Sequence, residues 1–210
     1  MSIYIHTSRM NTETPIMLIM ACQKYKSHLL AAMERMKHDA YTIIGVLGTS
    51  ESTTFEGGIL SLQVNDTYEH LPKKIHAAVK WVHANCPNTA GIFKTDDDIF
   101  FNDMNQLGAA IVANMNTPYW GIYTDNTNGG AVDVSRIMSR CDDTTLRPRY
   151  QKAHYCYGHG YWLSKEVIPI VCMSTKYETS FLEDVCTGYV LNLVGVYPVR
   201  IEIPYQERAR

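Results

Sequence analysis

The sequence predicts an α/β fold built on a sheet that is at least partly parallel. Three observations favour it. Short apolar runs of strand length alternate with longer stretches of helical period in the first half of the chain. The composition is that of a globular protein, with 46% apolar and 19% charged residues. The length of 210 residues suits one large domain. Such alternation is typical of units in which a helix connects two neighbouring parallel strands.

The first predicted strand is "PIMLIMAC" (15–22), a continuous apolar run. Such runs are typical of parallel strands that are buried on both faces. A helix is predicted next because five residues fall at i, i+4, i+7, i+8 and i+11, the spacing of an apolar helical stripe. These residues are Tyr25, Leu29, Ala32, Met33 and Met36.

The next elements continue the alternation. "YTIIGVLG" (41–48) and "GGILSLQV" (57–64) are predicted strands. "LPKKIHAAVKWVHAN" (71–85) is a predicted helix, and Pro72 suits its first turn, where no backbone N–H is needed. "TAGIFKT" (89–95) is a further strand, and it runs directly into three aspartates.

The second half is less regular. Residues 117–124 and the glycine-punctuated "YCYGHGYWLS" (155–164) are predicted strands. The polar, turn-rich stretch 125–154 has little helical period and is predicted to be a long connection or lid with room for a hairpin. A helix over 180–195 and a strand or extended segment over 196–204 complete the prediction. The two halves share strands too closely for a domain boundary, so a single domain over 1–210 is expected.

Composition and charge exclude several partners. The net charge of −2 gives no sign of nucleic acid or of an anionic membrane surface as a partner. No apolar run approaches the ~18 residues of a transmembrane helix, and the polar start "MSIYIHTSRMNTETP" lacks the apolar core of a signal peptide. The expectation is a soluble, cytoplasmic protein or a piece of a longer multidomain chain. Without secretion, the six scattered cysteines are expected to be reduced.

The aspartates Asp96, Asp97 and Asp98 follow a predicted buried strand, and ligands gather at the carboxyl ends of such strands. Side chains alternate along a strand, so Asp96 and Asp98 are expected on one side and Asp97 on the other. Two carboxylates on one side form a partial shell for Mn²⁺ or Mg²⁺, completed by water and substrate oxygens. The alternative is that these residues form a solvated turn or cap a helix.

Four ordered sequence blocks strengthen the metal hypothesis. "KTDDDIFFN", "LQVNDTYEHLPKKIHAAVKWVHANCPNTA", "YCYGHGYWLS" and "FLEDVCTGYVLNLVGVYP" cover roughly residues 59–198. They resemble the corresponding motifs of the β-1,3-galactosyltransferase-like family of inverting glycosyltransferases. The resemblance implies the GT-A fold, in which a Rossmann-like nucleotide-binding half (about 15–104) and an acceptor half (about 105–204) share a mixed central sheet flanked by helices. A member without an anchor is also similar to transferase domains of large DNA viruses of algae.

The resemblance implies roles for the acidic residues. Asp98 would bind the metal, Asp96 would lie toward the ribose or assist the metal, and the part of Asp97 in donor binding is less defined. Asp184, in the "LEDV" block, would be the general base that deprotonates the acceptor hydroxyl. Its place at a helix start is expected to favour the ionised form. Ser180 and Glu183 match a capping box, so Glu183 is alternatively a helix cap.

Four further residues are candidates for the donor site, each with a structural alternative. Gly158 and Gly160 flank His159; the glycines would let backbone approach a ligand, or would mark a bulge. His159 could reach the metal or a phosphate, or be structural. Lys74 aligns with a family lysine near the donor, or is a solvated helix lysine. Trp120, before Gly121, could stack on a sugar or belong to the core.

The sequence departs from the family in two places. The family's arginine-rich N-terminal block is replaced by "KYKSHLLAAMERM", and no histidine follows residue 159 to act as a C-terminal metal ligand. The best hypothesis is an inverting, metal-dependent transferase that moves a hexose or deoxyhexose from a nucleotide sugar, UDP-linked by resemblance, to a glycan or glycoprotein hydroxyl. One alternative is a non-catalytic sugar- or nucleotide-binding module. Another is a nucleotidyltransferase, although "ACQKYKS" lacks the glycines of its phosphate loop.

Overall fold

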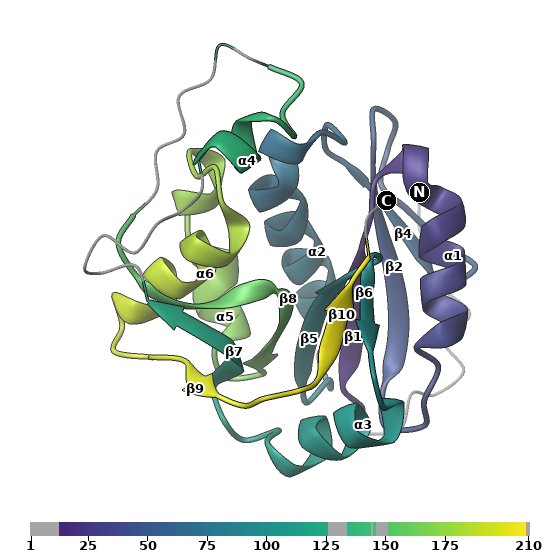
Figure 1. The fold of residues 1–210 in the computed structure, drawn as a ribbon, viewed down its shortest axis with the longest axis vertical. Coiled ribbons are helices and arrows are strands. Elements are labelled where there is room, and N and C mark those ends of the chain that lie inside the picture. Colours follow the sequence, from purple (N-terminus) through teal and green to yellow (C-terminus); the bar gives the residue numbers. More distant parts are fainter. Residues whose placement is uncertain (1–12, 126–133, 144, 146–150, 209–210) are drawn as a thin grey trace.

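The structure is a computed structural model that describes residues 13–125, 134–143, 145 and 151–208. Its centre is an eight-stranded mixed sheet with the strand order β3-β4-β2-β1-β5-β8-β7-β9. Helices cover both faces of this sheet, so the molecule has three layers (Figure 1). Strands from the first and second halves of the sequence lie in the same sheet, and the α/β class and mixed sheet predicted from the sequence are confirmed.

The parallel part of the sheet is formed by the first half of the chain. β1 (Ile16–Met20) lies between β2 (Thr42–Thr49) and β5 (Gly91–Asp96) and pairs in parallel with both. β2 also pairs in parallel with β4 (Ile59–Gln63). All five residues of β1 are buried, as expected for a strand covered on both faces. The carboxyl ends of β1 and β5 therefore lie next to each other, with Met20 opposite Asp96.

The second half of the chain extends the sheet with antiparallel pairs. β8 (His154–Ser164) runs antiparallel to β5 and to β7 (Tyr119–Asp125). The short β9 (Val199–Arg200) adds a parallel edge to β7. Because β8 is antiparallel to β5, the middle of β8 passes the carboxyl end of β5, where Gly160 pairs with Thr95.

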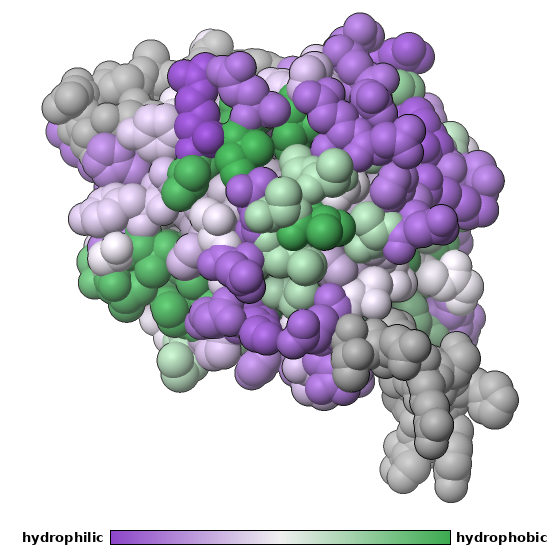
Figure 2. All heavy atoms as spheres, turned by 90° about the horizontal axis from the view of Figure 1, so that it is seen from below, coloured by the Kyte–Doolittle hydropathy of each residue, from purple (hydrophilic) through white to green (hydrophobic). Residues whose placement is uncertain are grey.

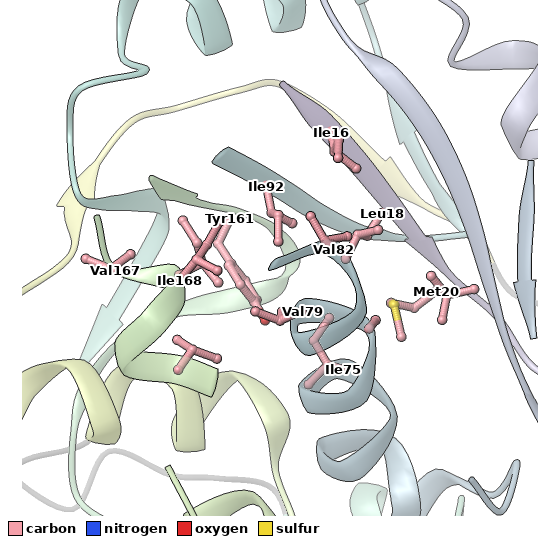
Figure 3. Close-up of a cluster of buried hydrophobic side chains, with 14 of the residues drawn as sticks. Ile16, Leu18, Met20, Ile75, Val79, Val82, Ile92, Tyr161, Val167 and Ile168 are labelled. Atoms are coloured by element: carbon pink, nitrogen blue, oxygen red, sulfur yellow. The ribbon is translucent and has the colours of Figure 1, made fainter. Parts of the chain in front are cut away.

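Two hydrophobic cores hold the helices to the sheet. α2 (Leu71–Asn85), α5 (Ile168–Met173) and α6 (Glu183–Asn192) share one core with the β1 side chains Ile16 and Leu18. Figure 3 shows these side chains facing those of α2. α1 (Lys26–Arg35) and α3 (Met104–Ala113) pack on the other face, against the alternate β1 side chains. Alternate burial of this kind lets one apolar strand anchor both layers.

The predicted strand 57–64 was wrong at its start. Gly57 and Gly58 have φ values of 56° and 79°, a left-handed conformation that glycine adopts readily. They form the turn of a hairpin between β3 (Thr54–Glu56) and β4. The strand therefore begins only at Ile59.

Sequence analysis also missed the helices α3 and α5 and the short strand β6 (Ile99–Phe101). A signal for α3 was present. The Asp103 carboxylate accepts hydrogen bonds from the backbone N–H groups of Asn105 (2.8 Å) and Gln106 (3.2 Å), which makes it the N-cap. Apolar residues four apart, Leu107 and Ile111, then bury one helix face.

The predicted extended segment 196–204 was only partly right. It contains the two-residue β9, and a further strand, β10 (Tyr205–Glu207), follows it. β10 pairs antiparallel with β6, directly after the three aspartates. The C-terminal segment thus crosses back over the first half of the chain, as its yellow ribbon beside β6 shows (Figure 1).

The predicted lid 125–154 lies partly outside the described residues. Within the described part, Val134–Met138 form the short helix α4, which the sequence pattern did not predict, and Ile137 is buried. The surface of the molecule seen from below mixes hydrophilic side chains with smaller hydrophobic areas (Figure 2). Among the residues that the structure describes, no helix combines the length and the apolar character needed to cross a membrane.

Candidate active site

A cleft of about 510 Å³ lies at the carboxyl ends of β1 and β5. Its walls come from the residues after β1, from the 3₁₀ helix Tyr68–His70 and the first turn of α2, and from the aspartate turn. Residues 139–142, the middle of β8 and the end of β10 close the remaining sides. This is the edge of the sheet at which the sequence predicted a ligand site, and elements from both halves of the chain line it.

The three aspartates divide between the cleft and the interior. Asp96 and Asp98 line the cleft, whereas the side chain of Asp97 is buried. The predicted separation of Asp97 from Asp96 and Asp98 is therefore present, but it does not come from the alternation of side chains along a strand. β5 ends at Asp96 and the next two residues form a turn. The turn is fixed where the backbone N–H of Asp97 donates to Met20 O at 3.1 Å, so Asp97 points away from the cleft.

A buried lysine connects the aspartates to the second half of the chain. Lys94 Nζ donates to Gly158 O (2.6 Å) and lies 2.8 Å from Glu183 Oε1 and 2.9 Å from Asp96 Oδ1. An ammonium group has three donors, so three acceptors satisfy it. Sequence analysis missed this residue, although a single lysine inside the apolar run "GIFKTD" requires a buried partner.

Glu183 is a buried partner of Lys94 and does not cap its helix. Its other oxygen, Oε2, accepts a hydrogen bond from the Tyr161 hydroxyl at 2.8 Å. The N-cap of α6 is Leu182, and no side chain caps this helix end. The capping-box interpretation of Ser180 and Glu183 was therefore wrong, because Lys94 and Tyr161 attract the carboxylate toward the sheet.

Asp184 follows in the first turn of α6. Its carboxylate accepts from the backbone N–H groups of Val185 (2.8 Å) and Gly158 (3.1 Å). Burial and the neighbouring Glu183 charge nevertheless raise the pKa of Asp184 to about 7. The two hydrogen bonds and the charge of Lys94 act in the opposite direction and lower this pKa, but they are outweighed. The helix start was expected to favour the ionised form of Asp184, but the pKa is raised, because desolvation is the largest influence on it.

Tyr68 places Asp184 in relation to the cleft. It lines the cleft, and its pKa is raised by burial and also by the charges of Asp184 and Asp96, while Arg140 lowers it. Tyr68 is therefore within electrostatic reach of both carboxylates. Asp96 and the candidate base Asp184 thus both act on one phenol group, although 88 residues separate them in the sequence (184 minus 96).

The Gly158-His159-Gly160 stretch forms an irregular part of β8. The register against β7 shifts between Gly121 and Tyr123, so that residues 157–160 bulge out of the β7 ladder. A Cβ on Gly158 would stand 2.8 Å from Glu183 Oε1. A Cβ on Gly160 would stand 3.0 Å from the Phe93 ring. The structure therefore shows the bulge, which was the structural alternative to a ligand-binding role for these glycines. A side chain at either position would crowd neighbouring protein atoms.

His159 and Lys74 both line the cleft. The His159 Nδ1 atom lies 2.8 Å from the Tyr205 hydroxyl, and burial lowers the pKa of the ring. Lys74 is buried, so the solvated-lysine alternative was wrong. Its ammonium group lies 2.7 Å from both Asp66 Oδ1 and Ala21 O. Lys74 therefore connects Asp66 to the residue that follows β1. The Asp66 carboxylate also accepts from the backbone N–H of Gly48 at 3.0 Å.

The donor set for a metal in this cleft is partial. Asp96 and Asp98 supply hard carboxylate oxygens, which suit Mg²⁺ or Mn²⁺. Within residues 13–125, 134–143, 145 and 151–208, no group of three or more His, Cys, Asp or Glu side chains could hold a metal ion. The two aspartates therefore fit the incomplete shell expected from the sequence, in which substrate and water provide the other ligands.

Two other expectations concern Trp120 and the cysteines. Trp120 has no exposed surface and stacks on Trp162, so it belongs to the core and the sugar-stacking alternative was wrong. The six cysteines all lie in the described part of the chain, and none of them forms a disulfide there, in line with the expectation of reduced thiols.

Comparison with known sequences identifies relatives of this chain. Residues 38–202 match the family model described as "Galactosyltransferase". "UDP-GalNAc:beta-1,3-N-acetylgalactosaminyltransferase 1" from Sus scrofa is 30% identical over 154 residues, which cover 67% of this chain and 42% of the relative. "Beta-1,3-galactosyltransferase 1" from Mus musculus is 28% identical over 177 residues, covering 83% and 53%. This chain thus spans about half the length of these relatives.

The fold itself also occurs in a solved structure of low sequence identity. The "4-diphosphocytidyl-2C-methyl-D-erythritolsynthase" from Anaerococcus prevotii DSM 20548 superposes with a TM-score of 0.53 and 13% identity, covering 91% of this chain and 88% of that chain. At this identity the likeness concerns the fold alone. It agrees with the GT-A fold that the sequence motifs imply.

Proposed function

This chain belongs to the galactosyltransferase family, and we propose that it is an inverting glycosyltransferase. It transfers a hexose or deoxyhexose from a nucleotide sugar to a hydroxyl group of a glycan or glycoprotein, and the donor is UDP-linked, as the name of the Sus scrofa relative suggests. The proposal rests on the family and on the positions of Asp96, Asp98 and Asp184. All three residues lie within the family match.

One observation carries the proposal: Asp96 and Asp184, carboxylates in different environments, are both within electrostatic reach of Tyr68 in the cleft wall. Asp96 and Asp98 are on the cleft wall, where a nucleotide diphosphate and its cation would lie. Asp184 is on a separate element, at the start of α6, and its pKa is near 7. Inverting transfer requires this separation, because the base must approach the sugar from the side opposite the leaving diphosphate.

In this mechanism Asp184 accepts the proton of the acceptor hydroxyl while the oxygen attacks the anomeric carbon. A base whose pKa lies near the working pH is effective, because about half of it is ionised and the ionised form still binds the proton well. The Gly158 and Val185 N–H groups hold the carboxylate in place during this step. Lys94 fixes the neighbouring Glu183, so that Glu183 keeps its place beside the base.

Asp96 and Asp98 would hold the cation, Mn²⁺ or Mg²⁺, which stabilises the negative charge that develops on the leaving diphosphate. Asp96 is held on one oxygen by Lys94, so its orientation in the cleft is fixed before a ligand binds. A fixed side chain loses less conformational freedom on binding than a mobile one.

A screen of nucleotide sugars in Mn²⁺ tests this function. Release of free nucleotide is measured with and without candidate glycan acceptors. Acceptor-dependent release from one donor is the expected result. Tight binding of a nucleotide sugar without transfer to any acceptor would contradict the catalytic proposal and favour a binding module instead.

A further inference from the structure

The end of the described chain contributes a wall of the cleft. The family match stops at residue 202, but β10 and Arg208 follow it and return to the aspartate turn. Three residues of β10 pair with β6. The backbone N–H of Arg208 donates to Asp98 O at 3.1 Å, so the segment is hydrogen-bonded to the turn that carries the candidate metal ligand.

Further side-chain contacts fix β10 to the other walls. The Tyr205 hydroxyl lies 2.8 Å from His159 Nδ1 in the β8 bulge. Glu207 lies 3.7 Å from both His159 Nε2 and the Arg140 guanidinium. β10 therefore joins three walls of the cleft, namely the aspartate turn, the bulge of β8 and the segment after α4.

Arg208 is held in the cleft by an aromatic ring. Its guanidinium carbon lies 4.0 Å from the centre of the Phe100 ring, and that of Arg35 lies 3.6 Å from the same centre. Two guanidinium groups cannot occupy one face at these distances, so they lie on opposite faces of Phe100. Arg35 donates to backbone oxygens of the turn, including Ile99 O at 3.1 Å, whereas Arg208 lines the cleft.

Charge distinguishes Arg208 from two other cationic side chains of the cleft. Lys74 is paired with Asp66, and Arg140 lies 3.7 Å from Glu207. In the described part of the chain, no carboxylate lies within 4.0 Å of the Arg208 guanidinium. Lys24, which also lines the cleft, likewise has no carboxylate within this distance among the described residues. Its ammonium lies 5.1 Å from the centre of the Tyr25 ring, farther than Arg208 lies from Phe100. An arginine held by stacking and not neutralised by a carboxylate is suited to bind a phosphate.

We propose that β10 completes the nucleotide cleft and that Arg208 binds a phosphate group of the nucleotide donor. This inference rests on the proposed function, because it takes a nucleoside diphosphate as the ligand. It adds a binding residue from outside the part of the chain that matches the family.

Binding of UDP and uridine tests the proposal. Both ligands are titrated in Mn²⁺ against the parent protein, Arg208→Ala and Arg208→Gln, with the melting temperature as a control of folding. We expect each variant to bind UDP about tenfold more weakly, a loss of about 1.4 kcal/mol, and uridine as the parent does, since a charge-assisted hydrogen bond to phosphate is removed. Arg200→Ala is the matched control, because Arg200 is an exposed arginine of β9 that pairs with Glu202, and it should leave both affinities unchanged.

The possible outcomes separate the two proposals. An equal loss of UDP and uridine binding would mean that Arg208 only supports the fold, and unchanged UDP binding would mean that it does not contact phosphate. Either result overturns the inference and leaves the proposed function in place. A parent protein that binds no nucleoside diphosphate would overturn the proposed function and this inference together.

Discussion

Lys94 is a buried cation whose three acceptors come from three different elements, β5, β8 and α6. Replacing it by Met leaves the buried Glu183 carboxylate without its cation. Loss of one partner of a buried ion pair typically costs ~3–5 kcal/mol of stability. We therefore expect Lys94→Met to lower the free energy of unfolding by about that amount in urea denaturation.

The double variant Lys94→Met with Glu183→Gln checks the physical cause. It removes both buried charges, and the new amide can still accept from the Tyr161 hydroxyl. The double variant should therefore be more stable than Lys94→Met alone. If the two substitutions destabilise additively, the pair does not interact as the geometry indicates.

The pKa of Asp184 predicts how activity depends on pH. A general base must be ionised, so transfer should rise with pH and reach half of its maximum near pH 7, where Asp184 titrates. Glu183→Gln removes a charge that raises this pKa, so the midpoint should move to lower pH. The measurement is the pH profile of kcat/KM, which reports ionisation of the free enzyme. A midpoint near pH 4 in the parent would contradict the buried environment of Asp184.

At the scale of elements, the β8 bulge brings its backbone against the buried charges. Gly158→Ala would place a Cβ 2.8 Å from Glu183 Oε1 and 3.2 Å from Lys94 Nζ. Gly160→Ala is the matched comparison, because its Cβ would instead press on the Phe93 ring at 3.0 Å. We expect both to lower the melting temperature, but Gly158→Ala to lower kcat more strongly. Equal effects on kcat would mean that the bulge does not position the base.

Elements with a strong local pattern could be predicted from the sequence. The apolar run of β1 and the helical stripe of α2 were found because burial on one or two faces dictates which residues are apolar. β10 was missed, because its three residues are partly exposed and its partner, β6, lies about 100 residues earlier. Pairing over such a distance leaves no local pattern in the sequence.

In the candidate site, too, only the features with a local sequence pattern could be predicted. The aspartates and the block containing Asp184 were recognised as motifs, and the aspartates were expected at the carboxyl end of a buried strand, where ligands gather. The Lys94 network and the contacts of Arg208 were not predicted, because they depend on tertiary packing between distant elements. The pKa of Asp184 was expected in the wrong direction for the same reason, since the burial of a single carboxylate at a helix start leaves no pattern in the sequence.

At the scale of the whole molecule, the cleft forms only when both halves of the chain share one sheet. Asp98 lines the cleft beside Asp96, on the turn that follows β5, and its carboxylate oxygens suit Mn²⁺ or Mg²⁺. Asp98→Ala should therefore abolish divalent-dependent binding of UDP while the melting temperature changes little. Calorimetry in Mn²⁺ and in EDTA measures this, and equal UDP affinity of the parent in both would rule out a metal role.

The central claim is that Asp96 and Asp98 bind the donor, whereas Asp184 on α6 is the base for the transfer. Asp184→Asn tests it most directly, because Asn keeps the size of the side chain and loses its basicity. Sugar transfer and UDP binding are measured on the same preparation of the parent and the variant. The account predicts that transfer falls by at least ~10²-fold, the lower range for general-base catalysis, while UDP affinity stays within about twofold of the parent's. Transfer at the parent's rate by Asp184→Asn would show that the base lies elsewhere and would contradict the account.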